Sequence, residues 1–362
     1  MIEQPYADPG WLDELLAQPV NFLDPEAPGG AVAISTRVRL ARNLRGFPFP
    51  PAGNGESAAE VSQAVKEAID RSGCLTEQKL SLNVGSLSLQ DAEILFERRL
   101  VSRELLQNSF GDVHIAHNQS CSVMVNEEDH VRMQLIRPGL QLQQAWREID
   151  RLDDCLCGEL DIAYDGSWGF LTACPSNVGT GVRFSVMLHL PALAMEDNIK
   201  QLERALAKLG LTIRGMFGEG SENIGNFYQI SNQSTLGESE EEIMEQLGRV
   251  VDQVIAHEEN TRSKLLEHHR NRLLDMIGRS FGTLRYSYIL SGKEAYQALS
   301  GVRLGVDMKM FNALDINTIN ELLIAVSPGH LQKKAMRQLS EAERAVLRAQ
   351  TVRERLKKSQ SV

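Results

Sequence analysis

The sequence predicts an α+β fold, in which a largely antiparallel sheet flanked by helices is followed by a helical carboxy-terminal domain. Strand-like runs that alternate apolar and polar residues mostly arrive in hairpin-like pairs, with helical segments between them. From Glu238 to Ile277 there is no proline and Gly248 is the only glycine, which indicates one long helix. The 362 residues, 42% of them hydrophobic, are enough for two domains.

The elements follow in order along the chain. Residues 1–30 are rich in Pro, Gly and Asp, and residues 1–25 are predicted to be a loose lead-in. Ala31–Leu44 alternates with period two, as a half-buried strand does. Further strands are predicted at Leu80–Val84, Cys121–Val125, Val131–Ile136, Trp168–Ala173, Val182–His189 and Gly225–Ser231. Apolar residues at helical spacing predict helices at Ser57–Arg71, Gln141–Leu156 and Pro191–Leu209. We place the boundary between a mixed domain (26–255) and a helical domain (256–362) at residue 255.

Composition excludes several classes of protein. The net charge of −10 argues against a mainly non-specific nucleic-acid binder. No run approaches the roughly 20 apolar residues of a membrane span, and the amino terminus lacks the basic start and apolar core of a signal peptide. Five scattered cysteines are typical of reduced thiols, so we expect a cytoplasmic protein.

Common catalytic signatures are missing. The sequence has neither a G-x-x-x-x-G-K-[ST] phosphate loop nor the glycine-rich loop, H-R-D and D-F-G set of protein kinases. Cys155 and Cys157 have no second ligand pair at zinc spacing, so no metal site is predicted.

Four segments carry residue types suited to chemistry. Ser35-Thr36-Arg37-Val38-Arg39 places two arginines on one face of a strand, because side chains two apart point the same way. Asn126–Arg132 (NEEDHVR) holds three consecutive carboxylates, and Cys174–Arg183 (CPSNVGTGVR) is a turn-rich loop that leads into a strand. Arg214–Glu219 (RGMFGE) is predicted to be a short loop. Singly, each pattern also fits a solvated strand, a surface turn or a small buried cysteine.

Together the four segments resemble the phosphagen kinases, the ATP:guanido phosphotransferase family. That family carries S-[ST]-R-V-R, N-E-E-D-H-x-R, C-P-[ST]-N-x-G-T-x-x-R and R-G-x-x-G-E in this order, and the match runs from about residue 31 to residue 235. The strand with Arg37 begins too early for the helical amino-terminal domain of the members that act on small guanidino compounds. With its helical carboxy-terminal extension, the chain is most similar to the bacterial protein-arginine kinase branch.

The resemblance implies roles for particular residues. Glu128 would be the general base, Glu219 an orienting clamp and Cys174 a thiolate beside the guanidinium. In the carboxy-terminal domain, Arg344 and Arg348 would hold the phosphoryl end of a regulatory phosphoarginine, although Ala345 replaces the aspartate of the branch's motif. The implied ATP contacts are Ser35, Thr36, Arg37, Val38, Arg39, Arg99, Arg132, Arg183, Phe184, Ser185, Val186, Met187, Arg214, Gly215, Met216, Phe217, Gly218 and Glu219.

The implied function is ATP-dependent phosphorylation of arginine side chains in proteins, with Mg²⁺ carried by the nucleotide. Arginine suits the phosphates because its planar fork donates paired hydrogen bonds and stays charged. The implied partners are proteins with exposed arginines, a Clp-type protease and a second copy bound through the carboxy-terminal domain, with no nucleic acid or membrane. Two alternatives stay open: a kinase for free arginine or another small guanidino compound, and an inactive adaptor that recognises phosphoarginine.

Overall fold

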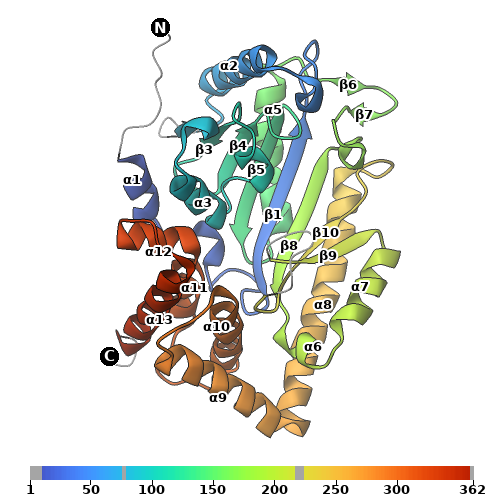
Figure 1. The fold of residues 1–362 in the computed structure, drawn as a ribbon. Coiled ribbons are helices and arrows are strands. Elements are labelled where there is room, and N and C mark those ends of the chain that lie inside the picture. The colour runs from blue at the N-terminus through green and yellow to red at the C-terminus, as the bar shows by residue number, and fades with distance from the viewer. Residues whose placement is uncertain (1–9, 76–78, 217–223, 359–362) are drawn as a thin grey trace.

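A computed structural model of the protein describes residues 10–75, 79–216 and 224–358. Their strands form an antiparallel sheet in the order β2-β3-β4-β5-β1-β8-β10-β9, with a separate two-stranded hairpin, β6–β7 (Figure 1). The predicted α+β class, a large antiparallel sheet flanked by helices, is confirmed. The strands are β1 (Ala33–Arg42), β2 (Leu80–Asn83), β3 (Asp112–Ile115), β4 (Cys121–Val125), β5 (Val131–Pro138), β6 (Tyr164–Asp165), β7 (Gly169–Phe170), β8 (Val182–His189), β9 (Leu211–Gly215) and β10 (Phe227–Asn232).

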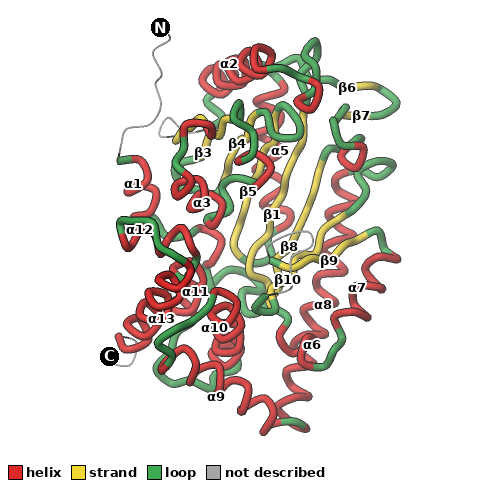
Figure 2. The backbone as a smooth tube through the Cα atoms, viewed as in Figure 1, coloured by secondary structure: helices red, strands yellow, loops and turns green. Residues whose placement is uncertain are grey.

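Helices occupy the flanks of the sheet and nearly all of the carboxy-terminal third (Figure 2). In the part of the chain that the structure describes, no helix combines the length and apolarity needed to cross a bilayer. The helices are α1 (Trp11–Ala17), α2 (Gly55–Ser72), α3 (Leu89–Glu97), α4 (Arg103–Leu106), α5 (Leu142–Cys157), α6 (Pro191–Met195), α7 (Ile199–Lys208), α8 (Glu240–His268), α9 (Arg270–Tyr286), α10 (Gly292–Asp307), α11 (Ile316–Ala325), α12 (Pro328–Ala335) and α13 (Glu341–Lys358).

One face of the sheet is apolar and the other is basic. Along β1, Val38 and Leu40 are fully buried in the main core, which α2, α5 and α8 complete. Arg37 and Arg39 alternate with them and therefore point to the opposite face. Strand periodicity thus places an apolar core behind the sheet and a basic surface in front of it.

The carboxy-terminal helices cover one end of the basic face. Met187, on the same face of β8 as Arg183, packs into a second core with Phe227 and with Leu299 of α10. His189, two residues further along β8, bonds through Nε2 to Ser300 Oγ at 2.8 Å. The helical third and the arginines therefore share one side of the sheet.

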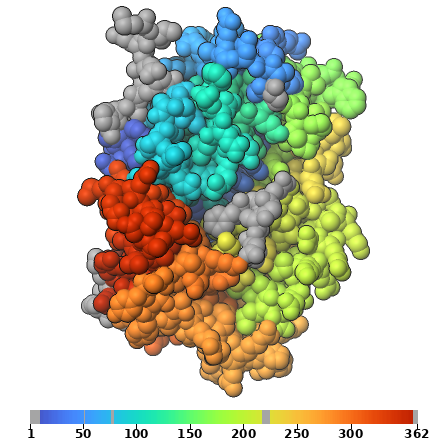
Figure 3. Space-filling model, viewed as in Figure 1, coloured from blue at the N-terminus to red at the C-terminus, as the bar shows by residue number. Residues whose placement is uncertain are grey.

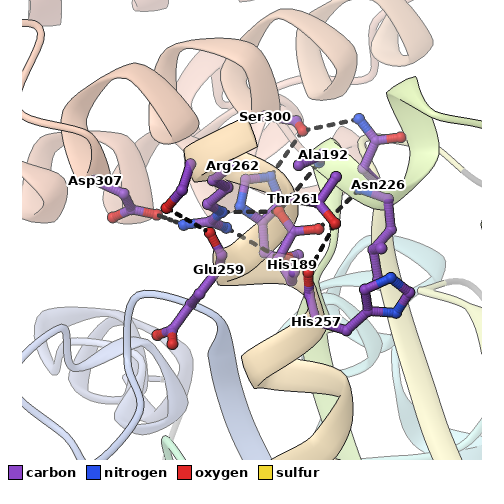
Figure 4. A network of polar contacts seen from close by, with 12 residues as sticks. His189, Ala192, Asn226, His257, Glu259, Thr261, Arg262, Ser300 and Asp307 are labelled. Atoms are coloured by element: carbon purple, nitrogen blue, oxygen red, sulfur yellow. Dashed lines mark hydrogen bonds and ion pairs between the residues drawn. The ribbon is translucent and has the colours of Figure 1, made fainter. Parts of the chain in front are cut away.

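A buried polar network ties α6, α8 and α10 together (Figure 4). Glu258 of α8 is fully buried, and its carboxylate accepts hydrogen bonds from the backbone N–H groups of Ala192 (3.1 Å) and Leu193 (2.9 Å). Arg262 donates to the same carboxylate at 2.8 Å and lies 3.6 Å from Asp307 of α10. Glu258 thus joins the long helix α8 to α6, and Arg262 joins it to α10.

Several expected element boundaries were wrong. The helix predicted over Pro191–Leu209 is two helices, since Asp197 has a left-handed φ of 56° that interrupts the hydrogen-bond ladder. The helix predicted from Glu238 to Ile277 breaks at His269, where φ is −129° and ψ 32°. Only Gly169–Phe170 of the strand predicted over Trp168–Ala173 forms.

Other elements were missed. The residues of the predicted lead-in that the structure describes include α1, whose Leu12 and Leu15 are buried. The strands β3 and β9 were not predicted either. Residue 255 lies inside α8, and the division of the chain into two domains there stays a prediction.

We predict that Glu258→Ala lowers the free energy of unfolding by about 3–5 kcal/mol, because it leaves the Nε of Arg262 and two amide groups buried without their acceptor. Urea unfolding followed by circular dichroism measures the change. The control is Glu245→Ala on the same helix, where the exposed pair with Arg249 should contribute less than about 0.5 kcal/mol. Equal losses in the two variants would contradict the proposed importance of the network.

Candidate functional site

Four of the predicted arginines share one face of the central strands. Arg39 on β1 lies directly opposite Arg183 on β8, and directly paired residues of neighbouring strands share a face. Arg37 is two residues from Arg39 on the same face, and Arg132 lies at the start of β5, where it pairs with Ala41. The sheet therefore assembles these guanidinium groups from three adjacent strands.

The positive charges of these guanidinium groups repel one another. Burial, followed by the positive charges of Arg99, Arg132 and Arg183, lowers the pKa of Arg37 to about 9. Burial and the same kind of repulsion hold the pKa of Arg39 well below its ordinary value, and its Nε is buried with no hydrogen-bond partner among the described residues. A polyanion seated here would relieve the repulsion and supply the missing acceptor, so the residues fit the triphosphate of ATP.

Glu127 is a carboxylate on this face to which sequence reasoning gave no role. Its side chain is fully buried and accepts hydrogen bonds from Arg132 and from Ser102 Oγ, the latter at 2.5 Å. Burial lowers the pKa of Arg132, but the charge and hydrogen bond of Glu127 outweigh it, so the net pKa is raised. Glu127 therefore keeps Arg132 charged and fixes its direction.

Asp129 joins the two loops that carry the predicted acceptor-side residues. Its Oδ1 accepts hydrogen bonds from Asn43 Nδ2 at 2.6 Å and from the backbone N–H of Ala173 at 2.7 Å. Burial raises the pKa of this carboxyl group. Because Glu128 precedes Asp129 and Cys174 follows Ala173, the structure brings the two predicted catalytic residues to one end of the sheet.

The loop that carries Cys174 is held by close backbone contacts. Gly179 has φ of 106°, and a Cβ there would lie 2.2 Å from the carbonyl oxygen of Thr235. The N–H of Thr180 donates to the same oxygen at 2.8 Å, so Gly179 is required for this approach. Cys174 Sγ is half-buried and lies 3.0 Å from Ser176 Oγ. The thiol is thus presented from a fixed loop.

The other predicted ATP contacts divide between the two faces. Thr36, Val38, Phe184 and Val186 are fully buried on the far side, and the structure does not bring their side chains to the arginines. Ser35, Ser185 and Met187 lie on the arginine side, where Ser185 Oγ donates to the carbonyl oxygen of Arg37 at 3.2 Å.

The segment predicted as a loop at residues 214–219 is partly a strand. Arg214 and Gly215 end β9, and Arg214 pairs with Gln229, whose side-chain oxygen accepts a hydrogen bond from Arg37 at 2.7 Å. Met216 packs against the carboxy-terminal core. The remaining predicted residues, Phe217, Gly218 and Glu219, lie outside the described part of the chain.

Arg99 borders the arginine face. It follows α3 with a left-handed φ of 60°, and its guanidinium carbon lies 4.5 Å from the ring centre of Phe22. Its carbonyl oxygen accepts from Gln134 Nε2 at 2.7 Å. The contact between Arg99 and adenine stays a prediction.

The two arginines of the predicted regulatory pocket contact the backbone. Arg348 is buried and donates to the carbonyl oxygens of Val326 (2.8 Å) and Leu290 (2.9 Å). Arg344 donates to the carbonyl oxygen of Leu339 at 2.8 Å. These bonds tie α13 to its neighbours, and the pocket itself stays a prediction.

The basic face of the sheet fits a polyphosphate donor, and comparison with known proteins shows the class of enzyme, a phosphotransferase with a guanidino acceptor. Residues 60–261 match the family model described as ATP:guanido phosphotransferase, C-terminal catalytic domain. Residues 270–362 match the model described as Protein-arginine kinase McsB C-terminal domain.

Relatives named protein-arginine kinase match nearly the whole chain. The one from Halothermothrix orenii is 41% identical over 332 residues, which are 91% of this chain and 95% of the relative. The one from Pelotomaculum thermopropionicum is 43% identical and covers 92% and 94% of the two chains. The chain belongs to the protein-arginine kinase family of ATP:guanido phosphotransferases.

Solved structures show the same fold at lower identity. A taurocyamine kinase from Schistosoma mansoni matches with a TM-score of 0.55 at 25% identity, over 68% of this chain and 37% of that one. A lombricine kinase matches with a TM-score of 0.56 at 23% identity, over 72% and 73% of the two chains, a likeness of fold alone.

We predict that Arg39→Met weakens ATP binding about 10- to 150-fold, because a charge-assisted contact worth about 1.5–3 kcal/mol is lost. The ligand-free protein should keep or raise its melting temperature, since Arg39 is repelled by Arg37, Arg132 and Arg183. Calorimetric titration with ATP and thermal unfolding measure the two effects. The control, Arg45→Met, removes an exposed arginine just beyond β1 and should change neither. Unchanged ATP affinity in Arg39→Met would remove Arg39 from the phosphate site.

Proposed function

We propose that this protein transfers the γ-phosphoryl group of ATP to arginine side chains of other proteins and forms phosphoarginine. The observation that carries the proposal is the link through Asp129, which places the loops of Glu128 and Cys174 together at one end of the arginine face. The relatives' name, protein-arginine kinase, supports a protein as the acceptor.

On the donor side, the protein positions the triphosphate of ATP and neutralises its negative charge. ATP, with Mg²⁺ held mainly by its own phosphates and water, supplies the phosphoryl group. Arg37, Arg39, Arg132 and Arg183 bind the phosphate oxygens with forked hydrogen bonds, and Arg214 approaches from β9. Their charges stabilise the negative charge that spreads over the oxygens as the phosphoryl group moves.

On the acceptor side, the substrate is a guanidinium cation whose nitrogens are poor nucleophiles. One nitrogen attacks the γ-phosphorus, the N–P bond forms, and the bond from the γ-phosphorus to the bridging oxygen of ADP breaks. Glu128 takes the proton that this nitrogen releases. Cys174 contacts the cation before transfer, and Glu219 is the proposed orienting carboxylate.

We further propose a cytoplasmic homodimer that pairs through its carboxy-terminal helices and marks proteins for a Clp-type protease. The support is the resemblance to the family and the match of residues 270–362 to its carboxy-terminal domain.

We predict that incubation with ATP and casein produces phosphoarginine, which mass spectrometry detects when samples stay non-acidic. The product is a phosphoramidate, so the label should be lost in hot acid, whereas phosphoserine survives. A parallel reaction with free L-arginine separates the two acceptor classes. Acid-stable label on serine or threonine, or transfer to free arginine alone, would overturn the proposal.

We predict that Glu128→Gln retains ATP affinity but lowers the transfer rate at least about 100-fold, since general-base roles are worth roughly this much. Glu56→Gln, which removes an exposed carboxylate in the first turn of α2, is the matched control and should transfer normally. Single-turnover kinetics with ³²P-labelled ATP give the rates. A variant that kept more than about a tenth of the wild-type rate would assign the proton to another group.

A further inference from the structure

A small hairpin next to the Cys174 loop exposes two large aromatic side chains. β6 and β7 pair Tyr164 with Phe170 and Asp165 with Gly169, and the hairpin protrudes at the upper right edge in Figure 3. Trp168 is 58% exposed and Tyr164 is 52% exposed. Side chains of this size are usually buried more fully, so the two exposed rings on this short hairpin are a candidate contact surface.

The hairpin is a rigid structure. Asp165 Oδ1 accepts hydrogen bonds from the backbone N–H groups of Ser167 (2.8 Å) and Trp168 (3.1 Å), which fixes the turn. The Tyr164 ring meets the Phe170 ring edge to face at 5.3 Å. The guanidinium carbon of Arg42 lies 3.4 Å from the centre of the Phe170 ring. A pre-ordered surface binds a partner at a lower entropic cost than a loose loop does.

The hairpin is also joined to the acceptor side of the site. Phe170 and Gly179 exchange backbone hydrogen bonds of 2.8 and 3.3 Å, so β7 pairs with the loop that carries Cys174. Gly169 has φ of 75°, and a Cβ on it would lie 2.6 Å from the carbonyl oxygen of Gly179. The aromatic side chains therefore keep a fixed position relative to Cys174.

Chain geometry brings a bound polypeptide to this surface. Trp168 and Cys174 are six residues apart, so at most roughly 20 Å separates them. Six extended residues beside a target arginine also span roughly 20 Å. Exposed aromatic faces bind both cationic and apolar side chains, and the neighbouring Asp165 is an exposed carboxylate. A segment rich in basic and apolar residues, as in an unfolded protein, has the matching chemistry.

We propose that the β6–β7 hairpin is a docking surface for the extended polypeptide around the target arginine, with Trp168 as its main contact. This inference rests on the proposed function, since it assumes that the acceptor arginine belongs to a protein. The hairpin contributes affinity for residues within about six positions of the target. The hairpin adds no affinity for a free guanidino compound, because such a compound is too short to reach from the catalytic loop to the hairpin.

The test compares a 13-residue peptide, with one central arginine flanked by lysine and leucine, with N-acetylarginine methylamide. Trp168→Ala should raise KM for the long peptide about 5- to 10-fold, which is the loss of one aromatic contact. Its KM for ATP, its kcat on the long peptide and its kcat/KM on the short compound should stay within about twofold of wild type. Trp168→Phe should restore most of the affinity.

Tyr286→Ala is the matched control, because Tyr286 is a 73% exposed aromatic on α9. Equal KM values for Trp168→Ala and Tyr286→Ala would overturn the inference, as would equal losses on long and short substrates. Tryptophan fluorescence gives a second measurement, since the long peptide should change the emission of wild type but not of Trp168→Phe. No such difference would also count against docking. If wild type forms no phosphoarginine on casein or the long peptide, the proposed function fails instead.

Discussion

The constraint on which the structure depends is the mutual repulsion of guanidinium groups on one face of a sheet. Two unit charges about 6 Å apart repel by about 3 kcal/mol at an effective dielectric constant of about 20. Full burial of a leucine or valine side chain stabilises by about 1.5–3 kcal/mol. β1 combines both effects, because Val38 and Leu40 lie in the core while Arg37 and Arg39 alternate with them. The apolar side of the sheet therefore offsets the electrostatic cost of the basic side, and Glu127 reduces that cost at Arg132.

The proposed sites for ATP and for the acceptor are built from different kinds of structure, strands for the first and loops for the second. The side chains proposed to bind phosphate project from long strands, whose register fixes their spacing. Glu128 and Cys174, which are proposed to face the acceptor, sit on loops that buried backbone contacts hold, through Asp129 at one end and Gly179 at the other. Loops are easier to vary than a sheet, so a site of this kind can change its acceptor while it keeps its nucleotide. The carboxy-terminal helices pack on the same face, at the end occupied by Met187 and His189.

Local patterns predicted much of this arrangement from the sequence. β1, β5, β8 and α5 were found because alternation and helical spacing are properties of a short window. β3 was missed because it is only four residues long, Asp112–Ile115, and so short a run gives a weak pattern. The breaks at Asp197 and His269 carry no proline or glycine signal. The sequence does not show which of the three consecutive carboxylates bonds to Ser102 and Arg132, and only the folded structure assigns this role to Glu127. The contact of Phe22 with Arg99 joins distant segments, which no local pattern reveals.

The alternation along β1 also limits where residues can be inserted or deleted in this part of the chain. One residue inserted or deleted between Val38 and Arg39 would reverse the facing of every side chain beyond it. Arginine would then enter the core, and leucine would line the face now occupied by the arginines. At its start, β1 already contains one irregularity of register, between Ala33 and Ser35, and the residue inside it, Ile34, belongs to the carboxy-terminal core. Natural variation in length is therefore expected before Ser35 or after Arg42, whereas the residues between them should vary by substitution alone.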